Sequence, residues 1–138
     1  MLHLNQIHKI FNEGTPDEKV AIDHVNLFLN PGDFVTVIGS NGAGKSTLMN
    51  IISGVLIPDV GEVQIGEKNV TNMSEYNRSK MIGRVFQDPM AGTAPSMTIE
   101  ENLAMAYSRN KVRTLRKGVT KKRRDYFREV LESLHLGL

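Results

Sequence analysis

Hydrophobic residues fall in short runs over the first 87 positions of the chain, and most of these runs predict strands. The run at 34–38 is almost unbroken and rich in β-branched residues, which is typical of a strand buried on both faces. In the second run the alternation of apolar and polar residues slips near Asp23 and His24, which predicts a β-bulge. Alternating or short apolar runs predict the other strands at 2–10, 20–29, 62–66 and 82–86.

One helix is predicted inside this strand-rich part. Residues 45–53 have apolar side chains at helical spacing, and Gly54 follows them as a predicted helix stop. A second, short and polar helix is predicted within 72–80. The first part of the chain is therefore expected to combine a sheet with at least one packed helix.

Beyond residue 97 the pattern is helical. Thr98 and Glu101 form a capping box for a helix that reaches about residue 107, and another helix is predicted to begin at Thr120. The change from a mixed strand and helix pattern to a helical pattern, near 88–97, is the one candidate subdomain boundary. The second helix places its apolar side chains at helical spacing, and we expect them to form its packed face: Phe127, Val130, Leu131 and Leu134.

Composition excludes several kinds of chemistry. The chain has 138 residues and no cysteine, so disulfides, thiolate zinc sites and cysteine nucleophiles are excluded. No apolar run is long enough to cross a bilayer. The four histidines have no metal-ligand spacing along the chain, and we interpret them as structural or exposed.

Positive charge is concentrated in one stretch. Residues 109–128 hold ten Lys and Arg residues against a single acid, Asp125, whereas the net charge of the whole chain is +2. Such a stretch suits an anionic partner such as nucleic acid or lipid headgroups. The simpler interpretation is a loop followed by a solvated helical face.

The sequence from Gly39 to Thr47 fits the P-loop pattern G-x-x-x-x-G-K-[ST]. Backbone N–H groups of such a loop surround phosphate oxygens, and glycines permit the close approach. The lysine offers a mobile positive charge for the β- and γ-phosphates, and the next hydroxyl offers an oxygen ligand for Mg²⁺. The candidate phosphate-binding residues are Gly39, Ser40, Asn41, Gly42, Ala43, Gly44, Lys45, Ser46 and Thr47, with Ser46 as the metal ligand.

Further motifs in the same order resemble the ATP-binding subunit of ABC transporters. Asn30-Pro31-Gly32-Asp33-Phe34 is similar to that family's turn before the P-loop strand, and Val85-Phe86-Gln87-Asp88 is similar to its Q-loop. Met97-Thr98-Ile99-Glu100-Glu101 resembles the start of its helical subdomain. The resemblance covers nearly the whole chain.

The resemblance implies an α/β fold, with a P-loop NTPase core, a small antiparallel β subdomain and part of a helical subdomain. It implies a nucleotide-binding core at 1–87, and a Q-loop with a partial helical subdomain at 88–138 that stops before the signature and Walker B motifs. Phe11 would stack on adenine. Gln87 would contact Mg²⁺ or the attacking water, which makes Gln87 and Lys45 the candidate catalytic residues.

The function implied is that of an ATPase that couples ATP binding and hydrolysis to solute transport. Its cofactors would be ATP and Mg²⁺, and its partners a transmembrane permease subunit and a second ATP-binding subunit, with a homodimer favoured and no nucleic acid. The protein would be peripheral, on the cytoplasmic side of the cell membrane. A small-solute importer is favoured, and amino acids are one possible cargo.

Two motifs needed for hydrolysis are absent from the 138 residues: the L-S-G-G-Q signature, and four apolar residues followed by Asp-Glu. We therefore expect this chain alone to bind nucleotide without efficient hydrolysis. Two alternatives stay open. One is another P-loop NTPase or a kinase, although no N-K-x-D guanine motif is present. The other is a basic module that binds nucleic acid or a membrane surface through 109–128.

Overall fold

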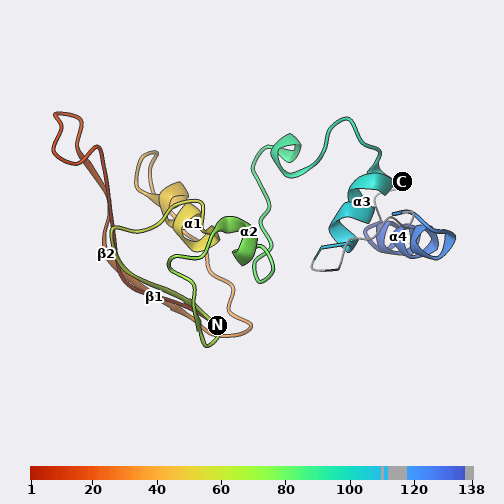
Figure 1. The fold of residues 1–138 in the computed structure, drawn as a ribbon, viewed down its shortest axis with the longest axis horizontal. Helices are drawn as coiled ribbons and strands as arrows, with labels where there is room; N and C mark the ends of the chain where they lie inside the picture. The colour runs from red at the N-terminus through yellow and green to blue at the C-terminus, as the bar shows by residue number, and fades with distance from the viewer. Residues whose placement is uncertain (110, 112–117, 136–138) are drawn as a thin grey trace. The chain divides into compact units, whose positions relative to one another are not determined.

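The computed structural model describes residues 1–109, 111 and 118–135, which form two compact units, Met1–Gly83 and Arg84–Leu138. The elements are drawn in Figure 1. In chain order they are β1 (Leu2–Phe11), β2 (Lys19–Leu29), α1 (Lys45–Ser53), β3 (Val60–Ile65), β4 (Lys68–Asn69), α2 (Glu75–Arg78), the 3₁₀ helix η1 (Pro89–Gly92), α3 (Ile99–Tyr107) and α4 (Lys121–Ser133).

The first unit is built on one antiparallel sheet with the strand order β2-β1-β3-β4. The pairing of β1 with β2 is interrupted, because Ile7 is opposite Val25 whereas Lys9 is opposite Ile22. His8 alone therefore faces two residues of β2, which is the geometry of a β-bulge. This bulge is the one that the slip in the apolar alternation predicts at Asp23 and His24.

Helix α1 covers one face of this sheet (Figure 1). Its buried apolar side chains, Leu48 and Ile51, pack against apolar side chains that the strands direct to the same face. Gly54 ends the helix with a left-handed φ of 85°, as its sequence position predicts. The other buried members of the core are Leu4, Ile7, Ile22, Val63 and Val70.

Arg78, at the end of α2, is fully buried beneath the carboxyl end of α1. Its Nη1 donates hydrogen bonds to the carbonyl oxygens of Ile51 (2.6 Å) and Ile52 (3.0 Å). Its Nε and Nη2 donate to the carbonyls of Met73 (2.9 Å) and Thr71 (2.7 Å). Burial lowers the pKa of this guanidinium. The partial negative charge at the helix end and these four carbonyls compensate the buried cation.

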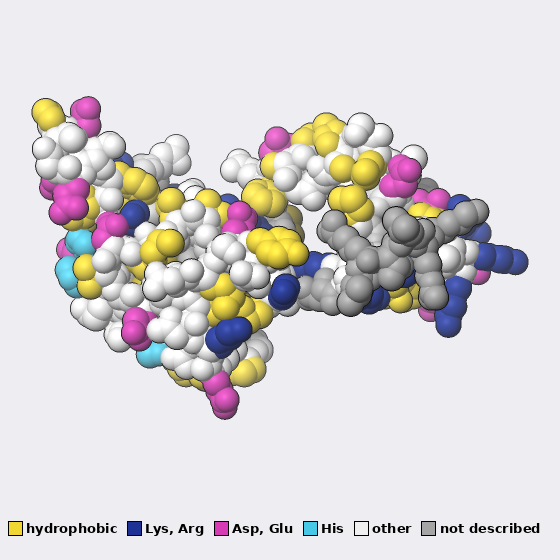
Figure 2. Space-filling view, viewed as in Figure 1, with side chains coloured by type: hydrophobic (Ala, Val, Ile, Leu, Met, Phe, Trp, Pro, Cys, Tyr) yellow, Lys and Arg dark blue, Asp and Glu magenta, His cyan; other side chains and the backbone are white. Residues whose placement is uncertain are grey.

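Two of the predicted strands are not formed. Neither 34–38 nor 82–86 pairs with another strand in the part of the chain that the structure describes. Phe34 is 95% exposed and Val85 is 96% exposed, and Figure 2 shows hydrophobic side chains at the surface. An apolar run indicates that a segment tends to be buried, but a strand also needs a neighbouring strand to pair with, and neither segment lies beside one among the described residues.

The second unit contains the capping box that the sequence predicts. The hydroxyl of Thr98 accepts from the Glu101 N–H (3.3 Å), and the Glu101 carboxylate accepts from the Thr98 N–H (2.8 Å). The backbone and hydroxyl hydrogen bonds from Thr98 hold the pKa of Glu101 below its usual value. This reciprocal pair begins α3.

Helix α4 contacts α3 through aromatic rings and an ion pair. The Phe127 and Tyr107 ring centroids are 5.8 Å apart, and Arg124 forms an ion pair with Glu100. Of the four apolar residues predicted to pack, Phe127 is buried and Leu131 half-buried, whereas Val130 and Leu134 are exposed. Residues 110 and 112–117 of the predicted basic loop lie outside the described residues.

Replacing Arg78 with Met should lower the free energy of unfolding by about 3–5 kcal/mol, because four buried or partly buried carbonyls would each lose the hydrogen bond from the guanidinium. Chemical denaturation followed by circular dichroism measures the loss. Arg128→Met, on the exposed surface of α4, is the matched control and should cost under about 0.5 kcal/mol. Similar losses for the two variants would contradict this role for Arg78.

Candidate phosphate-binding site

The candidate site is the loop from Gly39 to Gly44 together with the first turn of α1. The N–H of Ala43 donates to the carbonyl of Ser40 (3.2 Å), which closes a turn inside the loop. Gly42 and Gly44 have φ values of 84° and 87°, in the left-handed region that favours glycine. The backbone therefore curves tightly before it enters the helix.

Gly44 fixes the position of this loop against the sheet. A Cβ added to Gly44 would lie 2.4 Å from the carbonyl oxygen of Ala21 and 3.0 Å from the Cδ1 of Ile22. Only glycine permits an approach this close at this backbone angle. The end of the loop is therefore seated directly on β2.

The ammonium group of Lys45 is directed back to the loop. Its Nζ donates to the carbonyl oxygens of Gly39 (2.6 Å) and Ser40 (2.7 Å). The side chain thus places a full positive charge beside the start of the loop, although Lys45 itself begins α1. This is the position from which a flexible ammonium can reach a phosphate held by the loop.

The amino end of α1 adds backbone donors to the same place. The first intrahelical bond joins the Leu48 N–H to the Gly44 carbonyl at 2.8 Å, so the N–H groups of residues 45–47 precede the helical ladder. The first turn contains no acidic residue. Its unpaired donors and the positive end of the helix dipole favour an anion. Ser46 is exposed on this turn and offers an oxygen that suits Mg²⁺.

The predicted adenine contact, Phe11, is the last residue of β1 and is half-buried. The Lys9 ammonium lies 5.9 Å from its ring centroid. In the sheet Phe11 is directly opposite Lys19, and a Cβ added to Gly42 would lie 3.4 Å from the Lys19 Nζ. Pairing of β1 with β2 therefore brings Phe11, Lys19 and the loop to the same end of the sheet.

Lys19 is a candidate that the sequence did not reveal. It is a single lysine outside any motif, and only strand pairing brings it to the loop. Gln87, in contrast, lies in the second unit while the loop lies in the first. A shared metal site of Ser46 and Gln87 stays a prediction.

A glycine-rich loop that leads into a helix packed on a sheet defines the class of P-loop nucleotide-binding proteins. The sequence profile of the ABC transporter family matches residues 22–137. The chain belongs to the ABC transporter family.

Known proteins of the family resemble the chain over nearly all of its length. The tyrosine transport ATP-binding protein of Clostridioides difficile (strain R20291) is 38% identical over all 138 residues, which cover 55% of that protein. The glycine betaine/carnitine/choline transport ATP-binding protein OpuCA of Bacillus subtilis (strain 168) is 31% identical over 99% of the chain and 33% of its own length.

Solved structures confirm the fold class, an α/β P-loop NTPase. The dimeric structure of MJ0796, a bacterial ABC transporter cassette, matches 96% of the chain and 56% of its own length, with a TM-score of 0.75 and 31% identity. A post-hydrolysis state of that cassette bound to ADP and Pi matches with a TM-score of 0.73 and 28% identity. The chain spans about half the length of the relatives it matches most fully.

Replacing Gly44 with Ala should disrupt both the fold and the loop, because the new Cβ would overlap the Ala21 carbonyl. Gly32→Ala is the matched control, since Gly32 also has a positive φ (90°) but has no atom within 4 Å of the added Cβ. We expect Gly32→Ala to cost about 1 kcal/mol of unfolding free energy and Gly44→Ala at least about 1 kcal/mol more. Equal losses in denaturant titrations would show that the loop is not tightly seated on β2.

Proposed function

We propose that this chain binds Mg²⁺-ATP and forms part of the ATP-hydrolysing subunit of an ABC transporter. The observation that carries the proposal is the convergence of the Lys45 ammonium, the Gly39–Gly44 loop and the amino end of α1 on one small region. Positive charge and unpaired N–H donors at such a place match a polyphosphate. Membership of the family supports the choice of ATP.

Each part of the nucleotide has a candidate partner in the first unit. Loop amides and Lys45 would hold the phosphates, Ser46 would offer its hydroxyl to Mg²⁺, and Phe11 would provide an aromatic face for adenine. Lys19 adds a second cation near Gly42. Two cations at the loop would offset part of the charge of a triphosphate.

The residues needed to bind nucleotide differ from those needed to hydrolyse it. Phosphoryl transfer depends on placing a carboxylate, a metal ion and a water molecule about the γ-phosphate. The chain has Lys45 and, by resemblance, Gln87 for this task, but its 138 residues contain neither the Asp-Glu motif nor the L-S-G-G-Q signature. We therefore propose that the 138 residues bind nucleotide without efficient turnover.

The proposed partners are a second ATP-binding subunit and a transmembrane permease subunit. A solved relative is dimeric, which supports the first partner. None of the described helices combines the length and hydrophobicity that crossing a membrane requires. We propose a peripheral position on the cytoplasmic side of the membrane, where the region after Gln87 would contact the permease.

The proposed cargo is a small solute that is imported, with amino acids as one candidate class. One relative is a tyrosine transport protein, which supports amino acids as a candidate class. Another, the spermidine/putrescine import protein PotA from Lawsonia intracellularis (strain PHE/MN1-00), is 36% identical over 75% of the chain and supports import of a small solute.

The proposal predicts that Mg²⁺-ATP binding to the full chain weakens when Lys45 is replaced by Ala. Loss of a charge-assisted contact should cost about 1.5–3 kcal/mol, or roughly a 10- to 150-fold rise in Kd. Isothermal titration calorimetry measures the Kd of each chain for Mg²⁺-ATP. Lys68→Ala removes an exposed lysine on β4 of the same unit and should leave Kd unchanged. Equal affinity of the wild-type and Lys45→Ala chains would refute the proposal, and Lys45-dependent phosphate release would refute the lack of turnover.

Phe11→Ala should weaken ATP binding and reduce the preference for ATP over GTP, because it removes the aromatic face offered to the base. Stacking of a base on an aromatic ring contributes about 1–3 kcal/mol, which corresponds to roughly a 5- to 150-fold rise in the Kd for ATP. Phe28→Ala is the control, since Phe28 is a half-exposed aromatic on β2 that contacts His3. An unchanged ratio of the ATP and GTP constants would exclude Phe11 as the adenine contact.

A further inference from the structure

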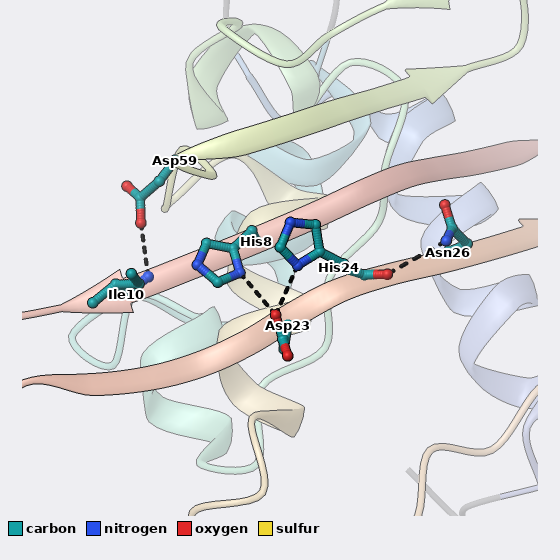
Figure 3. Close-up of polar contacts among 6 residues, drawn as sticks. All are labelled: His8, Ile10, Asp23, His24, Asn26 and Asp59. Atoms are coloured by element: carbon teal, nitrogen blue, oxygen red, sulfur yellow. Dashed lines mark hydrogen bonds and ion pairs between the residues drawn. The ribbon is translucent and has the colours of Figure 1, made fainter.

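His8, Asp23 and His24 form a cluster where β1 pairs with β2 in the sheet of the first unit (Figure 3). The Asp23 Oδ1 lies 3.2 Å from the Nδ1 of His8 and 2.7 Å from the Nδ1 of His24. The two imidazole centroids are 4.7 Å apart. The possible ligand atoms of the three residues all lie within 4.8 Å of one another.

The bulge in β2 creates this cluster. Consecutive residues of a regular strand point to opposite faces, so Asp23 and His24 would ordinarily be separated by the sheet. Here His24 has a left-handed φ of 45°, and the bulge brings its ring to the side of Asp23. His8 is the single β1 residue between the flanking pairs Ile7–Val25 and Lys9–Ile22. It therefore faces both of the β2 residues between those pairs, Asp23 and His24.

The strained backbone at His24 is held by its neighbour Asn26. The Nδ2 of Asn26 donates to the His24 carbonyl (3.3 Å), as Figure 3 shows. The Oδ1 of Asn26 accepts from the N–H of Gln6 (2.8 Å), which has a φ of 50° in a second bulge, on β1. One side chain thus stabilises both irregularities, and the cluster is set in a braced part of the sheet.

We propose that His8, Asp23 and His24 bind a divalent transition-metal ion of the zinc type. Two imidazoles and one carboxylate are ligands that Zn²⁺ accepts, with water completing the coordination. Ligands at zinc bonding distances of about 2.0–2.2 Å lie roughly 3.3 Å apart in a tetrahedral site. The 3.2 Å between His8 Nδ1 and Asp23 Oδ1 is close to this spacing, and the exposed His24 ring would move from its 2.7 Å contact with Asp23 to reach it.

The site is open to solution yet partly anchored. Asp23 and His24 are exposed, which gives a metal ion access, whereas the His8 side chain is only 15% exposed and is held by the sheet. The chain positions of these residues, 8, 23 and 24, do not resemble metal-ligand spacing, and only the pairing of β1 with β2 brings the two histidines together at Asp23. Magnesium prefers oxygen ligands, so this site is distinct in chemistry from one for Mg²⁺-nucleotide.

A bound ion would join β1 to β2 close to the phosphate loop. Asp23 lies two residues from Ala21, whose carbonyl contacts the region of Gly44. The ion would therefore stiffen the strand on which the loop is seated. The proposal does not depend on the proposed function, because it concerns only these side chains.

The test is calorimetric titration of the metal-free full chain with ZnCl₂ in a non-chelating buffer. We expect one Zn²⁺ per chain, no competition from excess MgCl₂, and a Kd raised about tenfold or more by His24→Gln or Asp23→Asn. His3→Gln is the matched control, because His3 is on β1 with His8 but lies outside the cluster. This substitution should leave the Kd for Zn²⁺ unchanged.

A second readout identifies the ligands where a variant fails to fold. In ¹H–¹⁵N spectra of the wild-type imidazoles, Zn²⁺ should shift the ring nitrogens of His8 and His24 and leave those of His3 unchanged. Zinc should also raise the melting temperature of the wild type but not of His24→Gln. Absence of zinc binding, equal binding in His24→Gln, or shifts centred on His3 would each overturn the proposal.

Discussion

The hydrogen bonds of Arg78 to the carboxyl end of α1 are the constraint on which the rest of the first unit depends. The helix has nine residues, and its two ends carry opposite partial charges. Arg78 occupies the negative end, where the Ile51 and Ile52 carbonyls accept from its buried guanidinium, and the same group also donates to the Thr71 and Met73 carbonyls before α2. The positive end stays available to an anion. A short helix can therefore present its amino end at a defined place because its other end is firmly held.

The antiparallel sheet determines where that amino end lies. Leu48 and Ile51 attach α1 to the sheet, and Gly44 lets the loop contact the backbone of β2. Strand β2 then continues through Ile22 into the bulge at Asp23. Strand β2 thus supports the phosphate loop at Ala21 and carries the histidine cluster at Asp23 and His24. A shift of the β2 backbone at one of these places would therefore be felt at the other.

Much of this arrangement could be predicted from the sequence, since local signals encode it. The P-loop pattern, the Gly54 helix stop, the Thr98–Glu101 capping box and the slip at Asp23 all depend on neighbouring residues, and the structure contains each of them. The prediction of strands at 34–38 and 82–86 was wrong. A strand forms only beside another strand, and the hydrophobicity of a segment does not specify which distant segment will pair with it. Lys19 and the His8 cluster could not be found for the same reason: only pairing of β1 with β2 brings their members together.

The central claim is that the loop and the amino end of α1 bind the phosphates of a nucleotide. Its most direct test is a titration of the ¹⁵N-labelled full chain with Mg²⁺-ATP, followed by ¹H–¹⁵N correlation spectra. If the loop and the amino end of α1 hold the phosphates, the largest shifts will fall on the amides of residues 39–47, and the amides of α4 will stay in place. Largest shifts on the basic helix α4, or loop amides that do not move at saturating nucleotide, would contradict the account.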